Sequence, residues 1–212
     1  MKQPGLDDYV RLAPVIPVVT IEDARLSIDL AQTLLRAGLP VIEVTLRTDA
    51  ALDAIGAIAK AVPEAVVAAG TVVDPRQIGE VIDAGAKMIV TPGTPQRLAE
   101  RLSEAAIPVI PGCSTVSEAM ALSDLGFKVL KFFPAAASGG VAWLKAVRGP
   151  LPHLTFCPTG GIDVASAPSF LSLPNVPCVG GTWMVPAEAL AKGDLSAIGR
   201  LAAEAAALRG GA

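Results

Sequence analysis

The chain has 212 residues, of which 52% are hydrophobic and 17% charged, and its net charge at pH 7 is -3. Such a chain can bury a large core, and we expect one domain over residues 1–212. The absence of basic runs argues against nucleic-acid binding, and no apolar stretch is long and unbroken enough to cross a membrane. Because the N-terminus has no apolar leader, we expect a cytoplasmic protein.

Short runs rich in Val, Ile and Pro alternate along the chain with longer segments rich in Ala and Leu. This alternation predicts strands and helices in turn, as in a parallel sheet. A further helix near Leu6 to Leu12 is expected before the first strand. The expected strands are Pro14–Val19, Val41–Arg47, Val66–Val72, Met88–Pro92, Pro108–Cys113, Val129–Phe133, Leu154–Thr159 and Pro177–Thr182.

The segments between the strands carry helix boundary signals. Residues 20–23 and the pair Asp74-Pro75 are typical helix starts, and Gly38, Gly85 and Gly126 are expected just beyond three helix ends.

Eight parallel strands joined by helices fit either a closed barrel or an open doubly wound sheet. A dinucleotide-binding open sheet would carry a G-x-G-x-x-G motif after an early strand, and the chain has none. We therefore predict an α/β fold, a (β/α)8 TIM barrel, with the extra N-terminal helix across its bottom.

Lys131 lies within the apolar strand that begins at Val129, where a charged residue is unexpected. Side chains alternate along a strand, so Lys131 shares a face with Phe133, which would form an apolar wall beside it or simply belong to the core. Burial favours the neutral form of a lysine, which is a nucleophile toward carbonyl carbon. A structural ion pair, or a head group that reaches solvent, is the alternative.

The second strand places Glu43, Thr45 and Arg47 on one face, which we expect to face the barrel interior. Glu43 is a candidate general acid and base, and Arg47 a candidate carboxylate ligand at the rim. The alternative is a structural Glu43–Lys131 salt bridge, with Arg47 solvated at the strand exit.

The last two strands finish at glycine pairs: Gly160-Gly161 follows the seventh strand, and Gly180-Gly181 ends the eighth, with Thr182 directly after the pair. Glycines let backbone N–H groups approach an anion, and loops after strands seven and eight of a barrel often bind phosphate. A hydroxyl at Thr182 would add a donor. One such pair is weak evidence, because ordinary turns also use glycine freely, but two pairs at these paired positions are more specific.

Other strand ends offer weaker candidates. Thr71 and Pro92 would face the interior, although Thr71 could merely finish a strand and Pro92 set a turn. Ser114 and Thr115 are interpreted as caps of the helix that begins near Val116.

Cys113, Cys157 and Cys178 are odd in number and widely spaced, so we expect reduced core residues and not a disulfide framework. His153 is the only histidine, and no group of residues has metal-ligand spacing. We expect neither a metal nor another cofactor.

At these residues the chain resembles the 2-keto-3-deoxy-6-phosphogluconate (KDPG) aldolases and the related 4-hydroxy-2-oxoglutarate (KHG) aldolases. The similarity runs in order over nearly the whole chain. The matching stretches are Glu43 to Thr48, Ala69 to Val72, Ile110 to Gly112, Ser114 to Glu118, Lys131 to Ala135, Phe156 to Ile162 and Gly180 to Trp183.

The resemblance implies a homotrimeric barrel that cleaves KDPG to pyruvate and glyceraldehyde 3-phosphate without metal, as in the Entner-Doudoroff pathway. Its second implied activity is cleavage of KHG to pyruvate and glyoxylate. Lys131 resembles the Schiff-base lysine and Glu43 the general acid and base. The remaining matches are Arg47, Thr71 and Pro92 at the pyruvyl end, Phe133 as a packing residue, and Gly160, Gly161, Gly181 and Thr182 at the phosphate.

The chain departs from the family motif at Thr182, where a serine is usual, so the geometry of phosphate contact is open. Thr159 is more similar to the gluconate-type enzymes than to those for the galactonate epimer. The choice among KDPG, its epimer and KHG is open. A phosphate-binding isomerase or epimerase and a non-catalytic binder of phosphorylated acids are the competing functions.

Overall fold

The computed structural model describes residues 5–208, which form a parallel α/β structure. Six strands pair in the order β5-β4-β3-β2-β1-β9, and three more in the order β6-β7-β8. Every strand pair is parallel, as predicted. The strands are β1 Val15–Val19, β2 Val41–Thr45, β3 Val66–Gly70, β4 Met88–Val90, β5 Val109–Ile110, β6 Gly112–Cys113, β7 Val129–Phe132, β8 Thr155–Pro158 and β9 Val179–Gly181.

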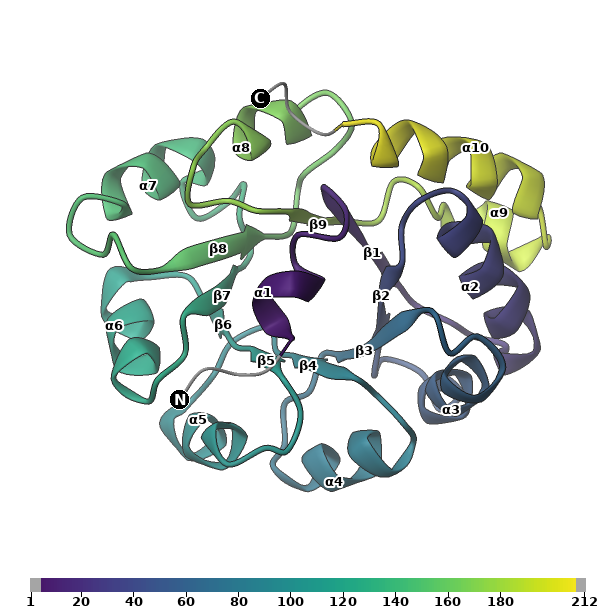
Figure 1. Ribbon diagram of the computed structural model, residues 1–212, viewed down its shortest axis with the longest axis horizontal. Helices are drawn as coiled ribbons and strands as arrows, with labels where there is room; N and C mark the ends of the chain where they lie inside the picture. Colours follow the sequence, from purple (N-terminus) through teal and green to yellow (C-terminus); the bar gives the residue numbers. More distant parts are fainter. Residues whose placement is uncertain (1–4, 209–212) are drawn as a thin grey trace.

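The strands curl around a common interior (Figure 1). The expected fifth strand is divided into β5 and β6 at Pro111, on either side of which the chain changes its strand partner from β4 to β7. Because proline has no N–H to donate, it interrupts the ladder there. A single bridge between Thr159 and Gly180 joins the three-stranded sheet to β9.

All helices except the first surround the strands on the outside (Figure 1). Their amphipathic faces pack against the outer face of the strands and share one large apolar core with them, in which Leu34, Ile55 and Leu102 of the helices are fully buried. The helices are α1 Leu6–Tyr9, α2 Ser27–Arg36, α3 Ala51–Ala61, α4 Arg76–Asp83, α5 Gln96–Ser103, α6 Val116–Asp124, α7 Gly140–Val147, α8 Ala167–Leu171, α9 Ala187–Ala191 and α10 Leu195–Ala206.

A second, smaller apolar cluster fills the interior enclosed by the strands. Leu6 and Val10 of the α1 region pack there against the first residues of β2 and β3, Val41 and Val66. The short N-terminal helix therefore covers the amino ends of the strands, as expected. The polar interior residues lie toward the opposite, carboxyl ends.

Most of the observed strands end earlier than the sequence pattern predicts, although the first ends at Val19 as expected. Arg47 and Thr71, expected at the ends of β2 and β3, lie in the loops that follow. The helix start expected at residues 20–23 lies a few residues before the start of α2. Asp23 caps a short 3-10 helix, Ala24–Leu26, which precedes α2.

Other helix boundaries agree with the prediction. Gly38, Gly85 and Gly126 follow α2, α4 and α6 with φ of 92°, 95° and 96°, the left-handed conformation that terminates a helix without a Cβ penalty. Asp74 accepts a hydrogen bond from the backbone N–H of Arg76 at the start of α4. Within residues 5–208, no helix combines the length and the apolar character needed to traverse a bilayer.

Candidate active site

Lys131 and Glu43 meet inside the curled sheet. Lys131 Nζ donates to Glu43 Oε1 at 2.9 Å and lies 3.3 Å from Oε2. The two side chains are only 6% and 5% exposed, so bulk water neither solvates nor screens the pair. An amine held in apolar surroundings within reach of a carboxylate can exchange a proton with it and can attack a carbonyl carbon.

The strands account for this meeting. Lys131 is in β7 and Glu43 in β2, and alternation turns both side chains inward while Ile42 and Leu130 join the outer core. The ring of Phe133 lies beneath the amine, with its centroid 5.6 Å from Lys131 Nζ. The expected apolar wall beside Lys131 is therefore present.

The other polar residues of β2 behave differently from Glu43. Thr45 is fully buried, but its hydroxyl donates to the carbonyl of Val19 and accepts from Thr20, so it ties β2 to β1. Arg47 lies beyond the strand with its side chain exposed. Of the three polar residues expected in the interior, Glu43 alone offers its functional group there for chemistry.

Thr71 follows β3 directly and has a φ of 62°. Within the described part of the chain, it is the only residue other than glycine with positive φ. A β-branched residue is strained in this left-handed conformation, and such strain is commonly retained at functional sites. Nothing in the local sequence pattern indicates this conformation.

Pro92 is held by hydroxyl groups that the sequence did not single out. Thr94 donates to the carbonyl of Gly112 at 2.9 Å, and Thr91 accepts from the N–H of Gly112 at 2.8 Å. The two hydroxyls are 2.8 Å apart, which closes the network. A Cβ at Gly112 would lie 2.5 Å from the carbonyl carbon of Pro92, so only glycine permits this approach.

The expected phosphate-binding residues lie after β8 and in and after β9. Gly160 and Gly161 have φ of 98° and 72°, which other residues rarely adopt. Gly181 is buried at the end of β9 and Thr182 is exposed just beyond it. Thr159 is buried, and its hydroxyl has no hydrogen-bond partner among the described residues.

Ser114 and Thr115 precede α6 as expected of caps. Thr115 accepts from the N–H of Glu118, and Glu118 accepts from the N–H groups of Ser114 and Thr115. This capping box stabilises the helix start, so the hydroxyl of Thr115 is structurally occupied. The hydrogen bonds from Ser114 and Thr115 lower the pKa of Glu118 below its ordinary value.

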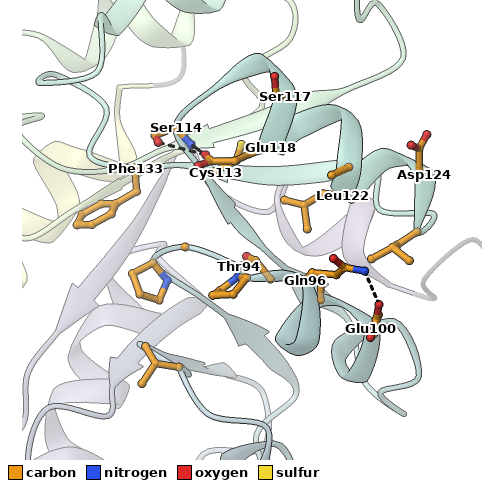
Figure 2. A pocket seen from close by; sticks show the side chains of 17 residues that line it. Thr94, Gln96, Glu100, Cys113, Ser114, Ser117, Glu118, Leu122, Asp124 and Phe133 are labelled. Carbon is orange, nitrogen blue, oxygen red and sulfur yellow. Dashed lines mark hydrogen bonds between the residues drawn. The ribbon is translucent and has the colours of Figure 1, made fainter.

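A groove of about 880 Å³ adjoins this region between α5 and α6 (Figure 2). Phe133 and Pro92 line its inner side, whereas Lys131 and Glu43 do not line it. The groove therefore neighbours the Lys131–Glu43 pair without containing it. Cys113 also lines the groove, and burial raises the pKa of its thiol to about 12, with a smaller contribution from Glu118.

The three cysteines are free and buried, as expected. Cys178 and Cys157 are in contact, with their sulfur atoms 3.6 Å apart, and this contact together with burial raises the pKa of Cys178. His153 is exposed, and its Nε2 lies 3.0 Å from Ser123 Oγ. Within residues 5–208, no three His, Cys, Asp or Glu side chains are grouped so that they could hold a metal ion.

Comparison with known proteins agrees with this geometry. The family model for KDPG and KHG aldolases matches residues 6–201. A KHG/KDPG aldolase from Escherichia coli (strain K12) is 50% identical over 94% of this chain and 93% of its own length.

Solved structures of such aldolases are also similar. A KDPG aldolase from Legionella pneumophila, with pyruvate captured as a covalent carbinolamine, has a TM-score of 0.93, 41% identity and coverage of 97% of this chain and 98% of its own. The enzyme of Zymomonas mobilis ZM4 with 3-phosphoglycerate has a TM-score of 0.91, 42% identity and coverage of 96% of both chains. The fold, the buried lysine–glutamate pair and the similarity over almost the entire length agree: the chain belongs to the KDPG and KHG aldolase family.

Proposed function

We propose that this aldolase cleaves KDPG to pyruvate and glyceraldehyde 3-phosphate, and KHG to pyruvate and glyoxylate, through a Schiff base on Lys131. The observation that carries the proposal is the buried contact between Lys131 Nζ and Glu43 Oε1 at 2.9 Å. The curated relatives are named as aldolases of these substrates, and the Legionella enzyme holds pyruvate as a carbinolamine.

In the first step, the neutral amine of Lys131 attacks the C2 ketone of the substrate. The resulting carbinolamine loses water and becomes a protonated imine, which draws electrons from the neighbouring carbons. Glu43 takes the proton that the attacking amine loses, because the two groups are already hydrogen bonded, and gives it to the departing hydroxyl, so the carboxylate is ionised again before the next step.

Carbon–carbon cleavage then requires a base. Glu43, through a water molecule, removes the proton of the C4 hydroxyl. The C3–C4 bond then breaks and its electron pair moves into the imine, so that the aldehyde product leaves and an enamine remains on Lys131. Glu43 returns a proton to C3, and hydrolysis of the imine releases pyruvate and the free Lys131.

Substrate binding uses the residues at the carboxyl ends of the strands. The exposed guanidinium of Arg47 is suited to the substrate carboxylate, and the apolar ring of Phe133 limits water near the imine. Binding of the remote phosphate positions the reacting carbons. The proposed contacts are Thr71 and Pro92 at the pyruvyl end, Thr159 along the substrate, and Gly160, Gly161, Gly181 and Thr182 at the phosphate.

We also propose that the strands close into a barrel, that the protein is a trimer and that it is cytoplasmic. The bridge between Thr159 and Gly180 supports closure of the two sheets into one (β/α)8 barrel. Exposed Val116, Met120 and Leu125 on and just after α6 support burial of this helix face in a homotrimer. The three free thiols are suited to a reducing cytoplasm.

Pyruvate release from KDPG, from its galactonate epimer and from KHG, followed with a coupled dehydrogenase, tests the activity and ranks the substrates. We expect the highest kcat/KM with KDPG, and no release from any of the three would refute the proposal. The Glu43→Gln variant should still form some imine while kcat falls about 10²- to 10⁴-fold. Unimpaired turnover by this variant would remove Glu43 from the mechanism.

A further inference from the structure

Gly70, the last residue of β3, lies directly against the side chain of Glu43. If a Cβ were built on Gly70, it would lie 2.6 Å from Glu43 Cγ and 2.8 Å from Cδ, and closer still to Oε1. All three of its nearest neighbours would be Glu43 atoms. The surface that the glycine leaves open is therefore occupied by the carboxylate that contacts Lys131.

The backbone conformation at position 70 does not require a glycine. Gly70 is in regular pairing with Thr45 of β2 and is not among the glycines of positive φ, whereas Gly160 and Gly161 are. Any residue can adopt this extended conformation, and a glycine inside a strand weakens it unless another group must approach closely. The group that approaches Gly70 most closely is Glu43.

We infer that Gly70 is a positioning residue of the aldolase, whose missing side chain lets the Glu43 carboxylate rest on β3 and point at Lys131. This inference rests on the proposed function of Glu43. It adds to that function the structural feature, a missing side chain at Gly70, that holds the flexible Glu43 side chain in one position. Lys131 in β7 donates a hydrogen bond to the Glu43 carboxylate. The backbone of Gly70 lies against the same side chain from β3, the strand that pairs with β2.

Gly70→Ala is the direct test. Ordinary carbon–carbon contact needs about 3.5 to 4.0 Å, so the carboxylate must retreat by roughly 1 Å. The obstructing atoms belong to the free end of a side chain, and the fold can accept the methyl group by moving Glu43. Displacement of this size at a reacting group lowers rates about 100-fold.

Two measurements distinguish the role of Glu43 from that of Lys131. Borohydride trapping of pyruvate reports imine formation at Lys131, and exchange of the pyruvate methyl protons in deuterium oxide reports proton transfer by Glu43. For Gly70→Ala we expect trapping to persist, exchange and kcat to fall about 10- to 100-fold, and KM to change by less than about threefold. Exchange and kcat within twofold of the wild type would overturn the inference.

Gly79→Ala is the matched control, because a Cβ at Gly79 in α4 would meet no heavy atom within 4 Å. This variant should match the wild type in trapping, exchange and kcat. Loss of activity in both variants to the same extent would count against a specific role of Gly70.

Unfolding by urea gives a test that does not depend on activity. Gly70→Ala should lower the unfolding midpoint while Glu43 is present and leave it nearly unchanged in a Glu43→Ala background, where the obstruction is gone. Equal shifts in both backgrounds would overturn the inference. If wild-type Lys131 is not trapped at all, the proposed function fails, and this comparison still decides whether Gly70 positions Glu43.

Discussion

Lys131 and Glu43 are 88 residues apart in sequence, and their side chains form a buried ion pair with 2.9 Å between Nζ and Oε1. Desolvating two charges costs free energy that their attraction offsets only when the geometry is good. In the proposed mechanism, the contact that stabilises the resting pair is also the route by which a proton leaves the amine.

Removal of one partner should therefore cost more stability than removal of both charges. Lys131→Met leaves the Glu43 carboxylate buried and unpaired, so we expect the free energy of unfolding to fall by about 3 to 5 kcal/mol. Lys131→Met combined with Glu43→Gln should recover a large part of this loss. Urea unfolding of the single and double variants measures the difference, and equal losses would show that the pair is not coupled.

Relief of strain at Thr71 should raise stability and lower activity. A β-branched residue at a φ of 62° costs about 1 to 3 kcal/mol, and glycine adopts this conformation freely. Thr71→Gly is expected to raise the melting temperature. Thr71→Val keeps the strained backbone conformation, so its melting temperature should not rise. Both variants lose the hydroxyl proposed to bind substrate, so kcat/KM should fall in each. A Thr71→Gly protein less stable than Thr71→Val would refute the strain argument.

Cys113 should make the protein less stable at alkaline pH. Burial raises the pKa of its thiol from 9.0 to about 12 in the folded state, so between these values the unfolded chain releases the proton and the folded chain keeps it. The stabilisation is fully present below pH 9 and is lost as pH rises, by up to about 1.4 kcal/mol per pH unit.

Comparison with Cys113→Ala isolates this contribution from other groups that titrate at high pH. We expect the variant's free energy of unfolding to fall less steeply with pH between 9 and 12 than that of the wild type. Parallel curves for the two proteins would contradict the assignment.

Much of this molecule could be predicted from sequence because strand periodicity and burial are local properties. The alternation in Val41 to Thr45 indicated that Glu43 faces inward, and one lysine within an apolar strand indicated its partner. The three glycines that follow α2, α4 and α6 and the capping box at Thr115 also follow from local rules.

The remainder depends on contacts between segments far apart in the sequence. The hydroxyl network around Pro92 requires the loop after β4 to lie against β6. The contact of Gly70 with Glu43 depends on the direction in which one side chain extends across the sheet. The left-handed conformation of Thr71 is imposed by the surrounding fold against the residue's own preference. None of these has a signature in the local sequence pattern.

Borohydride reduction in the presence of pyruvate, followed by peptide mass spectrometry, tests the central claim most directly. We predict a stable pyruvate-derived adduct on Lys131, and none on Lys87, whose ammonium is bound to the carbonyls of Pro63 and Ala65. Inactivation should parallel labelling, and Lys131→Arg should remain unlabelled and inactive. An enzyme that keeps its aldolase activity while Lys131 stays unmodified would contradict the account.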